Sequence, residues 1–292
     1  MPRYYKIAGI TIRLNCDKDL FKGLLDRQFK TYSVSDVESS DLSIEVCCKK
    51  FIAIPKGRLL MDEEIKWIRK ENGGYFTYSV NPQNEIFVAA ESNDNWKNTK
   101  ICLLLRHNTY FCKLAAAKHL YLILGTVFRN AIVEHDGLFI HASSIDYSNQ
   151  GVLFSAPSGT GKSTHTSLWT QLYQNQTRII NDDSPIIRLI DGIPYLFGAP
   201  WCGSSYKGIN DSVPLSAMVA IERGETNTIR KLESAEALRK LLPRVFIPYF
   251  DRNLAGMAIS TFEKVLYKVP SYNLACTIHP EAVELVRACL NA

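Results

Sequence analysis

The segment APSGTGKS, residues 156–163, constrains the fold of this 292-residue chain more than any other stretch. It matches the phosphate-binding loop pattern G-x-x-x-x-G-K-[ST] at every position except the first, where Ala156 replaces glycine. The apolar run GVLFS before it predicts a buried strand, and HTSLWTQLY after it predicts a helix. A loop of this kind connects a strand to a helix, so the sequence predicts an α/β fold with mixed sheets.

Each residue type in the loop has a physical reason. Glycines at 159 and 161 allow the backbone to bend until successive N–H groups face one anion. Lys162 would neutralise the β- and γ-phosphates, and the Ser163 hydroxyl would bind Mg²⁺. Alanine at 156 is compatible with the loop if its φ angle is negative. The residues predicted to bind the nucleotide are Ser158, Gly159, Thr160, Gly161, Lys162, Ser163 and Thr164. The alternative is a glycine-rich turn that contains Lys-Ser by chance.

The pattern of the chain changes near residue 130. Before it, short alternating segments such as ITIRL and GYFTYSV predict a β-rich domain, which a helix over 111–130 closes. After it, LFIHASSI, GVLFSA and RIINDDSPIIRL each predict one buried strand. Ser234 is predicted to cap a helix, and Pro280 to begin the last one. We therefore expect a smaller β-rich domain at 1–130 and a domain that carries the loop at 131–292.

Asp182 and Asp183 are the candidate partners of the loop because they follow an apolar run, as the acidic residue of many nucleotide-hydrolysing proteins does. Adjacent residues of a strand point to opposite faces. One carboxylate would then hold the water shell of the metal, and the other would take the proton of an acceptor hydroxyl. This division favours a kinase over a simple hydrolase. The alternative is a solvated Asp-Asp turn before Ser184 and Pro185.

Residues 136–292 resemble the catalytic domain of HPr kinase/phosphorylase, which shares the phosphoenolpyruvate carboxykinase type of P-loop. The matching segments are FIHASSI, SGTGKST and INDDSPII. The resemblance implies that Lys162 and Ser163 bind phosphates and Mg²⁺, that Asp183 is the catalytic base and that Asp182 is its metal-side partner, with the two aspartates interchangeable. It also implies that His141 lies close to the transferred phosphate.

On the acceptor side the resemblance is thinner. GAPWCGSSYKGIN occupies the place of a family segment that shapes the acceptor side of the cleft, and Trp201 lies within it. DRNLAGMAI resembles an Arg-Asn stretch near the family's active site, where Arg252 would clamp a phosphate. For Trp201, loop packing is the alternative; for Arg252, it is a surface salt bridge. The first 130 residues do not match the bacterial enzyme, so its carrier-protein substrate does not transfer.

Three functions remain open. The first is a kinase that uses ATP and Mg²⁺ to phosphorylate a hydroxyl of a protein, peptide or small molecule. The second is a nucleotide-gated binding protein without catalysis. The third is a carboxykinase-like lyase, for which the chain lacks a second Lys/His metal cluster.

Composition excludes other classes of protein and partner. The net charge of +5 comes from scattered Lys and Arg residues, so we expect neither nucleic-acid nor membrane binding. The eight cysteines include no C-x-x-C pair, which argues against a zinc site and favours free thiols in the cytoplasm. The start of the chain lacks the long apolar region of a signal peptide. Because the bacterial family is hexameric, the resemblance leaves a homo-oligomer open.

Overall fold

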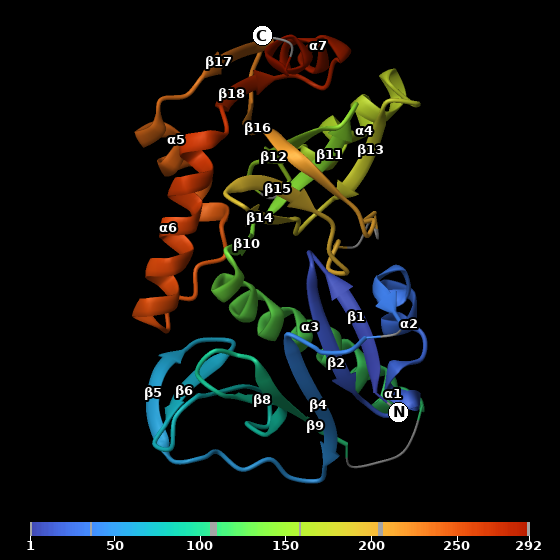
Figure 1. The fold of residues 1–292 in the computed structure, drawn as a ribbon, viewed down its shortest axis with the longest axis vertical. Helices are drawn as coiled ribbons and strands as arrows, with labels where there is room; N and C mark the ends of the chain where they lie inside the picture. The colour runs from blue at the N-terminus through green and yellow to red at the C-terminus, as the bar shows by residue number, and fades with distance from the viewer. Residues whose placement is uncertain (1, 36, 106–109, 158, 204–206, 291–292) are drawn as a thin grey trace. The chain divides into compact units, whose positions relative to one another are not determined.

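The computed structural model describes residues 2–35, 37–105, 110–157, 159–203 and 207–290. The chain folds into two compact units, whose elements Figure 1 labels. The first unit is Met1–Glu134 together with Pro248–Arg252, and the second is His135–Ile247 together with Asn253–Ala292. The sequence predicts a division near residue 130 but gives no sign that a second, short segment belongs to the first unit.

The first unit is built on one mixed sheet. Among the described residues it has nine strands in the order β3-β1-β2-β4-β9-β8-β7-β6-β5. The pairs β2–β4 and β4–β9 are parallel, and the others are antiparallel. The strands are β1 (Arg3–Ile7), β2 (Ile10–Asn15), β3 (Ser33–Val34), β4 (Leu42–Lys49), β5 (Gly57–Asp62), β6 (Lys66–Lys70), β7 (Tyr75–Val80), β8 (Ile86–Ser92) and β9 (Asn98–Leu104).

Helix α3 (Tyr110–Ala131) packs on β8 and β9 and confirms the helix predicted over 111–130. Two short helices, α1 (Lys18–Phe21) and α2 (Leu24–Phe29), also pack against α3. The segment 248–252 joins this unit through its aromatic core. The Phe250 ring stacks on Trp67 with centroids 3.9 Å apart, and the Tyr75 hydroxyl donates a hydrogen bond to the Asp251 carboxylate.

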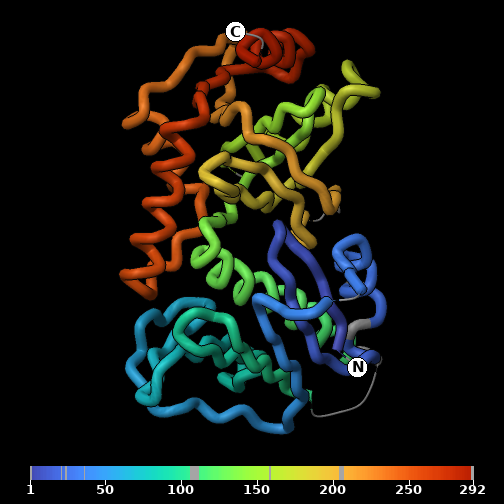
Figure 2. Tube along the Cα trace, viewed as in Figure 1, coloured from blue at the N-terminus to red at the C-terminus, as the bar shows by residue number. Residues whose placement is uncertain are grey.

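The second unit is also built on a mixed sheet. Its described strands run in the order β10-β14-β15-β16-β12-β11-β13, with β18 pairing both β16 and β17. Figure 2 follows the chain through this unit, where distant segments, green for β11 and β12, orange for β16 and red for β18, belong to one sheet. The strands are β10 (Gly137–Phe139), β11 (Ala142–Tyr147), β12 (Gln150–Ser155), β13 (Thr177–Asn181), β14 (Ile186–Ile190), β15 (Ile193–Phe197), β16 (Ser212–Arg223), β17 (Thr228–Lys231) and β18 (Ser271–Cys276).

The second unit also contains helices, of which the first, the second and the last contact the sheet. They are α4 (Lys162–Leu172), α5 (Ser234–Leu241), α6 (Arg252–Lys268, whose first residue is grouped with the first unit) and α7 (Pro280–Leu290). Trp169 of α4 and Val283 of α7 pack with Phe154 and Val219 of the sheet in one buried cluster. Helix α7 begins at Pro280 as predicted, but Ser234 does not cap α5, because Glu233 occupies the cap position without a side-chain bond.

Two strands predicted as continuous are broken in the structure. Within the stretch RIINDDSPIIRL, strand β13 ends at Asn181. The Asn181 Oδ1 accepts hydrogen bonds from the backbone N–H groups of Asp183 and Ser184, and this turn interrupts the strand. The chain resumes as β14 after Pro185, which has no N–H to donate. The stretch LFIHASSI breaks between β10 and β11, where the His141 N–H donates to the carbonyl of Arg244 at 2.8 Å. Both breaks lie at residues predicted to carry the chemistry.

Candidate functional site

The glycine-containing loop connects β12 to the first turn of α4, which begins at Lys162. Gly159 and Gly161 have φ angles of +74° and +114°, which side-chain-bearing residues rarely adopt. A Cβ atom at either position would meet no heavy atom within 4 Å, so the space beside both peptides is open. Ala156 is buried and is not among the residues with positive φ, which is the condition for an alanine at this position. Ser158 lies outside the described residues.

Lys162 is a buried cation at the start of α4. Its Nζ donates to the carbonyl oxygen of Ala156 at 3.0 Å and lies 3.1 Å from the His141 Nε2. Burial lowers the pKa of Lys162, and the positive charge of Arg244 lowers it further. The ammonium group is therefore destabilised by its surroundings, and a bound anion would relieve that cost.

His141 lies between Lys162 and the aspartate pair. Its Nδ1 is 3.5 Å from the Asp183 Oδ1. Burial lowers the pKa of His141, and the charge of Lys162 is the next cause. A neutral imidazole that accepts from Lys162 at Nε2 carries its proton on Nδ1, facing Asp183. The three side chains thus form a continuous line from the loop to the carboxylate.

The two aspartates have different environments. Asp182 is buried, and its Oδ1 accepts a hydrogen bond from the Ser143 hydroxyl at 2.6 Å. The Asp183 side chain is 38% exposed, and its Oδ2 accepts from the Ser184 hydroxyl at 2.9 Å. Only Asp183 of this pair therefore has a carboxylate that a solvent-borne molecule reaches readily.

The stretch 199–203 packs around the aspartate pair. The Asn181 side-chain amide donates to the carbonyl of Ala199 at 3.0 Å and to that of Trp201 at 3.3 Å. Gly203 has a φ of +65°, and a Cβ there would lie 2.9 Å from the Asp183 Cβ. The Trp201 ring is buried and meets Phe139 edge-on at 5.8 Å. The backbone carbonyl of Trp201 thus lies near the aspartates because Asn181 bonds it, while the Trp201 ring packs against Phe139.

Two arginines near the loop were missed by sequence reasoning. Arg223, at the end of β16, donates to the Gly159 carbonyl at 3.0 Å. Arg244, in a short 3-10 turn, lowers the pKa of both Lys162 and His141 by its charge. Neither lies in a recognisable motif. Arg252 is exposed and is grouped with the first unit, so its predicted place in the cleft stays a prediction.

A cavity of about 330 Å³ lies beside the loop in the second unit. Gly159, Thr160, Gly161 and Thr164 line one part of it. The rest is largely apolar, with Leu168, Ile221, Cys276 and Ile278 among its lining residues. The pocket is therefore lined by polar loop residues in one part and mainly by apolar side chains in the rest.

His165 lines the same cavity and makes a pH prediction possible. It is buried, its Nε2 accepts a hydrogen bond from the Trp169 indole at 3.2 Å, and burial lowers its pKa to about 4. Below the ordinary histidine pKa of about 6.5 the unfolded chain binds the extra proton, so stability falls as the pH drops from about 6.5 through 4. The loss should reach about 3 kcal/mol, with none of it appearing above pH 7.

The check is urea denaturation at a series of pH values for the wild type and His165→Gln, which keeps an acceptor oxygen and does not titrate. The difference between the two stability curves should change between pH 6.5 and 4 and stay constant above that range. If the two stability curves run parallel between pH 6.5 and 4, His165 does not have the lowered pKa.

In proteins Mg²⁺ takes oxygen ligands. The predicted metal-side residues, Ser163 and Asp182, offer a hydroxyl and a carboxylate, which are ligands that Mg²⁺ accepts. Within the described part of the chain, no group of three or more His, Cys, Asp or Glu side chains could hold a metal ion. This donor set suits a cation that arrives with nucleotide phosphates and keeps several waters.

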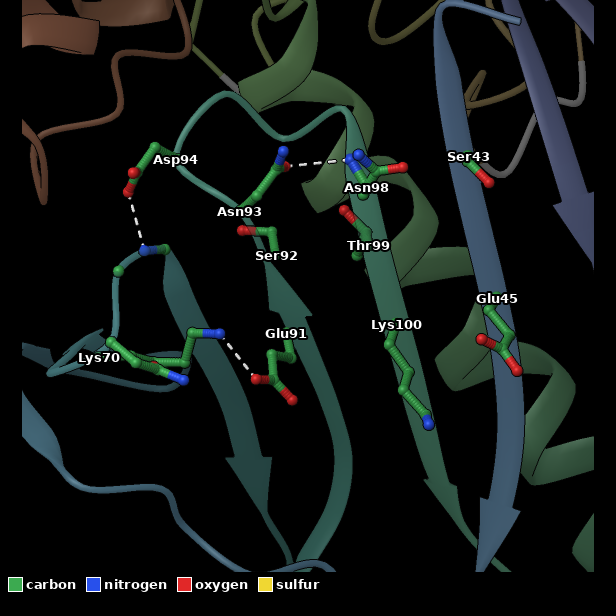
Figure 3. Close-up of a pocket in the computed structure, with 13 residues that line it drawn as sticks. Ser43, Glu45, Lys70, Glu91, Ser92, Asn93, Asp94, Asn98, Thr99 and Lys100 are labelled. Carbon is green, nitrogen blue, oxygen red and sulfur yellow. Dashed lines mark hydrogen bonds and ion pairs between the residues drawn. The ribbon is translucent and has the colours of Figure 1, made fainter.

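A second cavity, of about 490 Å³, lies on the first unit and is shown in Figure 3. Three of its charged side chains have partners: the Lys70 Nζ pairs with the Glu91 carboxylate at 2.7 Å, and Asp94 accepts from the backbone N–H of Gly74 at 2.8 Å, while Glu45 and Lys100 complete the charged lining. This mutual pairing is the pattern of a solvated sheet face, and nothing in the cavity singles out a ligand.

No protein-family model and no curated protein matches the chain. Among solved structures it is similar to the Hpr(Ser) kinase/phosphatase from Coxiella burnetii, at 14% identity and a TM-score of 0.31. That match covers 52% of this chain and 95% of the other. A likeness this distant does not determine the activity of the chain. None of the described helices is both long and apolar enough to cross a membrane.

Proposed function

We propose that the second unit is a phosphotransferase that uses ATP and Mg²⁺ to phosphorylate a hydroxyl group. The observation that carries the proposal is the continuous line from Lys162 through His141 to Asp183, which starts beside two positive-φ glycines at the N-terminus of α4. The loop peptides and the helix N-terminus favour an anion. The exposed carboxylate at the other end offers a base to a second substrate.

In this mechanism Asp183 accepts the proton of the acceptor hydroxyl as its oxygen attacks the terminal phosphorus of ATP. The new P–O bond forms while the bond to the β-phosphate oxygen breaks, and ADP leaves with that bond's electron pair. Lys162 moves from the carbonyl of Ala156 to the β- and γ-phosphates and stabilises their charge in the transition state. His141 positions both groups through its two ring nitrogens.

Mg²⁺, when bound with the nucleotide, would neutralise phosphate charge. Ser163 and Asp182 are the residues proposed to hold it, Ser163 directly and Asp182 through its water shell. The buried Ser143–Asp182 hydrogen bond fixes the orientation of that carboxylate. We propose Asp183 as the base because it is the more exposed of the two aspartates.

The cavity beside the loop is proposed to hold the nucleoside. A base is flat and largely apolar on its faces, and the wall formed by Leu168, Ile221 and Ile278 offers apolar contact. The loop glycines that line the cavity would offer N–H groups to the phosphates. In this proposal one pocket holds both parts of one nucleotide.

Titration calorimetry and a labelled-phosphate screen together test the proposal. We expect the full-length protein to bind ATP with Mg²⁺ and to transfer the γ-label to a hydroxyl in a panel of serine- and threonine-containing peptides, hydroxy amino acids and sugars. EDTA should stop the transfer. Binding without transfer to any acceptor would instead favour the nucleotide-gated binding protein, and absence of binding would refute both hypotheses.

A further inference from the structure

The first unit has another cavity besides the one in Figure 3, and the lining of this other cavity is mainly apolar. It has a volume of about 390 Å³ and lies between residues 50–54, the start of β8 and the end of β9. Ile86 and Leu104 line its sheet side. Ile52 is buried in a cluster with Phe76 and Tyr78 and anchors the segment 50–54 to the sheet.

The anchored segment exposes large apolar side chains on either side of Ile52. Phe51 is 75% exposed and Ile54 is 52% exposed, and both line the groove. Leu59, at the start of the next strand, is 50% exposed. Figure 1 shows this stretch as an extended connection between β4 and β5. Several exposed apolar side chains gathered around a concave surface are typical of an interaction site.

The same stretch is strongly basic. Between residues 49 and 58 the chain carries Lys49, Lys50, Lys56 and Arg58 and no acidic residue. All four side chains are exposed, and within the described part of the chain none of them forms an ion pair. Glu85 also lines the cavity, and its carboxylate accepts a hydrogen bond from the neutral Asn81 side-chain amide at 3.2 Å. Lys50 lines the cavity itself, and the other three cations lie within a few residues of its lining segment along the chain, so this stretch presents positive charge to an external anion.

We propose that this groove binds a peptide segment of a partner protein, with an apolar side chain in the groove and acidic residues on its flanks. The exposed Phe51 and Ile54 supply the apolar contact, and the four cations supply electrostatic complementarity. This role does not depend on phosphotransfer by the second unit.

Other occupants fit the groove less well. A bilayer surface is attracted to the same cations but cannot enter a concave pocket, so it leaves the apolar lining unfilled. A second copy of the chain in a two-fold arrangement would bring the same four cations toward one another, which costs free energy. An extended acidic peptide satisfies the cavity and the charges together.

Fluorescence anisotropy with labelled peptide pools tests the proposal. The pools have a centre randomised among apolar residues and flanks of Asp and Glu. We expect binding to the full-length protein that weakens as salt rises. Ile54→Ser should weaken binding about tenfold or more, because it removes a large apolar side chain from the contact. The double change Lys50→Glu and Lys56→Glu should abolish binding at low salt.

Matched controls separate this proposal from the alternatives. Ile193→Ser, at the equally exposed (52%) Ile193 of the second unit, should leave binding unchanged. Pools with a serine centre or with lysine flanks should not bind. The proposal is overturned if no pool binds, if Ile54→Ser and Ile193→Ser behave alike, or if the protein binds phosphatidylserine vesicles through Lys50 and Lys56 but binds no peptide.

Discussion

Replacement of Asp183 by asparagine should lower phosphoryl transfer about 10²- to 10⁴-fold while ATP affinity changes only a few-fold. Asparagine has nearly the shape of aspartate but cannot accept the acceptor's proton. The Asp183 side chain lies next to His141 and Ser184, not against the loop glycines, so nucleotide contacts should survive. The measurements are single-turnover transfer of labelled phosphate and calorimetric titration with ATP and Mg²⁺.

Two further variants sharpen this prediction. Asp182→Asn replaces a buried carboxylate that accepts from Ser143, so it should weaken the dependence of the rate on Mg²⁺ as well as the rate. Asp191→Asn changes an acid with positive φ in the β14–β15 turn, and asparagine tolerates that conformation, so it should leave transfer intact. Normal transfer by Asp183→Asn would show that the base is a different group.

The loop could be predicted from sequence because its information is local. Positive φ at two glycines, a buried strand before them and a helix after them are all encoded within a few residues. The helix over 111–130 could be predicted for the same reason, since its apolar periodicity is a property of one segment. Likewise, the alternating strands of the first sheet are recognisable one by one.

The strand breaks and the arginines could not be predicted in the same way. The break at His141 depends on a hydrogen bond to Arg244, a residue far away in the chain. Arg223 approaches Gly159 only because β16 pairs with β12 in the folded sheet. The break after Asn181 did have a local signal, since Asn followed by Asp-Asp-Ser-Pro is typical of a side-chain-stabilised turn. The apolar residues on both sides of this turn favour a single long strand, so the turn was not predicted.

Replacement of Lys162 by alanine should weaken binding of ATP with Mg²⁺ roughly 10- to 100-fold and remove measurable transfer. The side chain is buried beside the loop, where the Ala156 carbonyl holds its ammonium until phosphates replace that bond. Losing it removes a charge-assisted bond to phosphate in the ground state and charge stabilisation in the transition state. Lys162→Arg retains the charge and should recover part of the affinity, whereas Lys231→Ala, at an exposed position, should have no effect.

The same variant gives a signal that does not depend on the acceptor. The charge of Lys162 is, after burial, the largest cause that lowers the pKa of His141. Its removal should therefore raise the pKa of His141, which NMR titration of the imidazole resonance can follow. Nucleotide binding to the wild type should raise the same pKa, because phosphates bring negative charge to the site, so binding near pH 6 should take up protons. A His141 titration that is identical in the wild type and Lys162→Ala would mean that the 3.1 Å contact between Lys162 and His141 does not exist in solution, and the line of groups that carries the proposed mechanism would be broken.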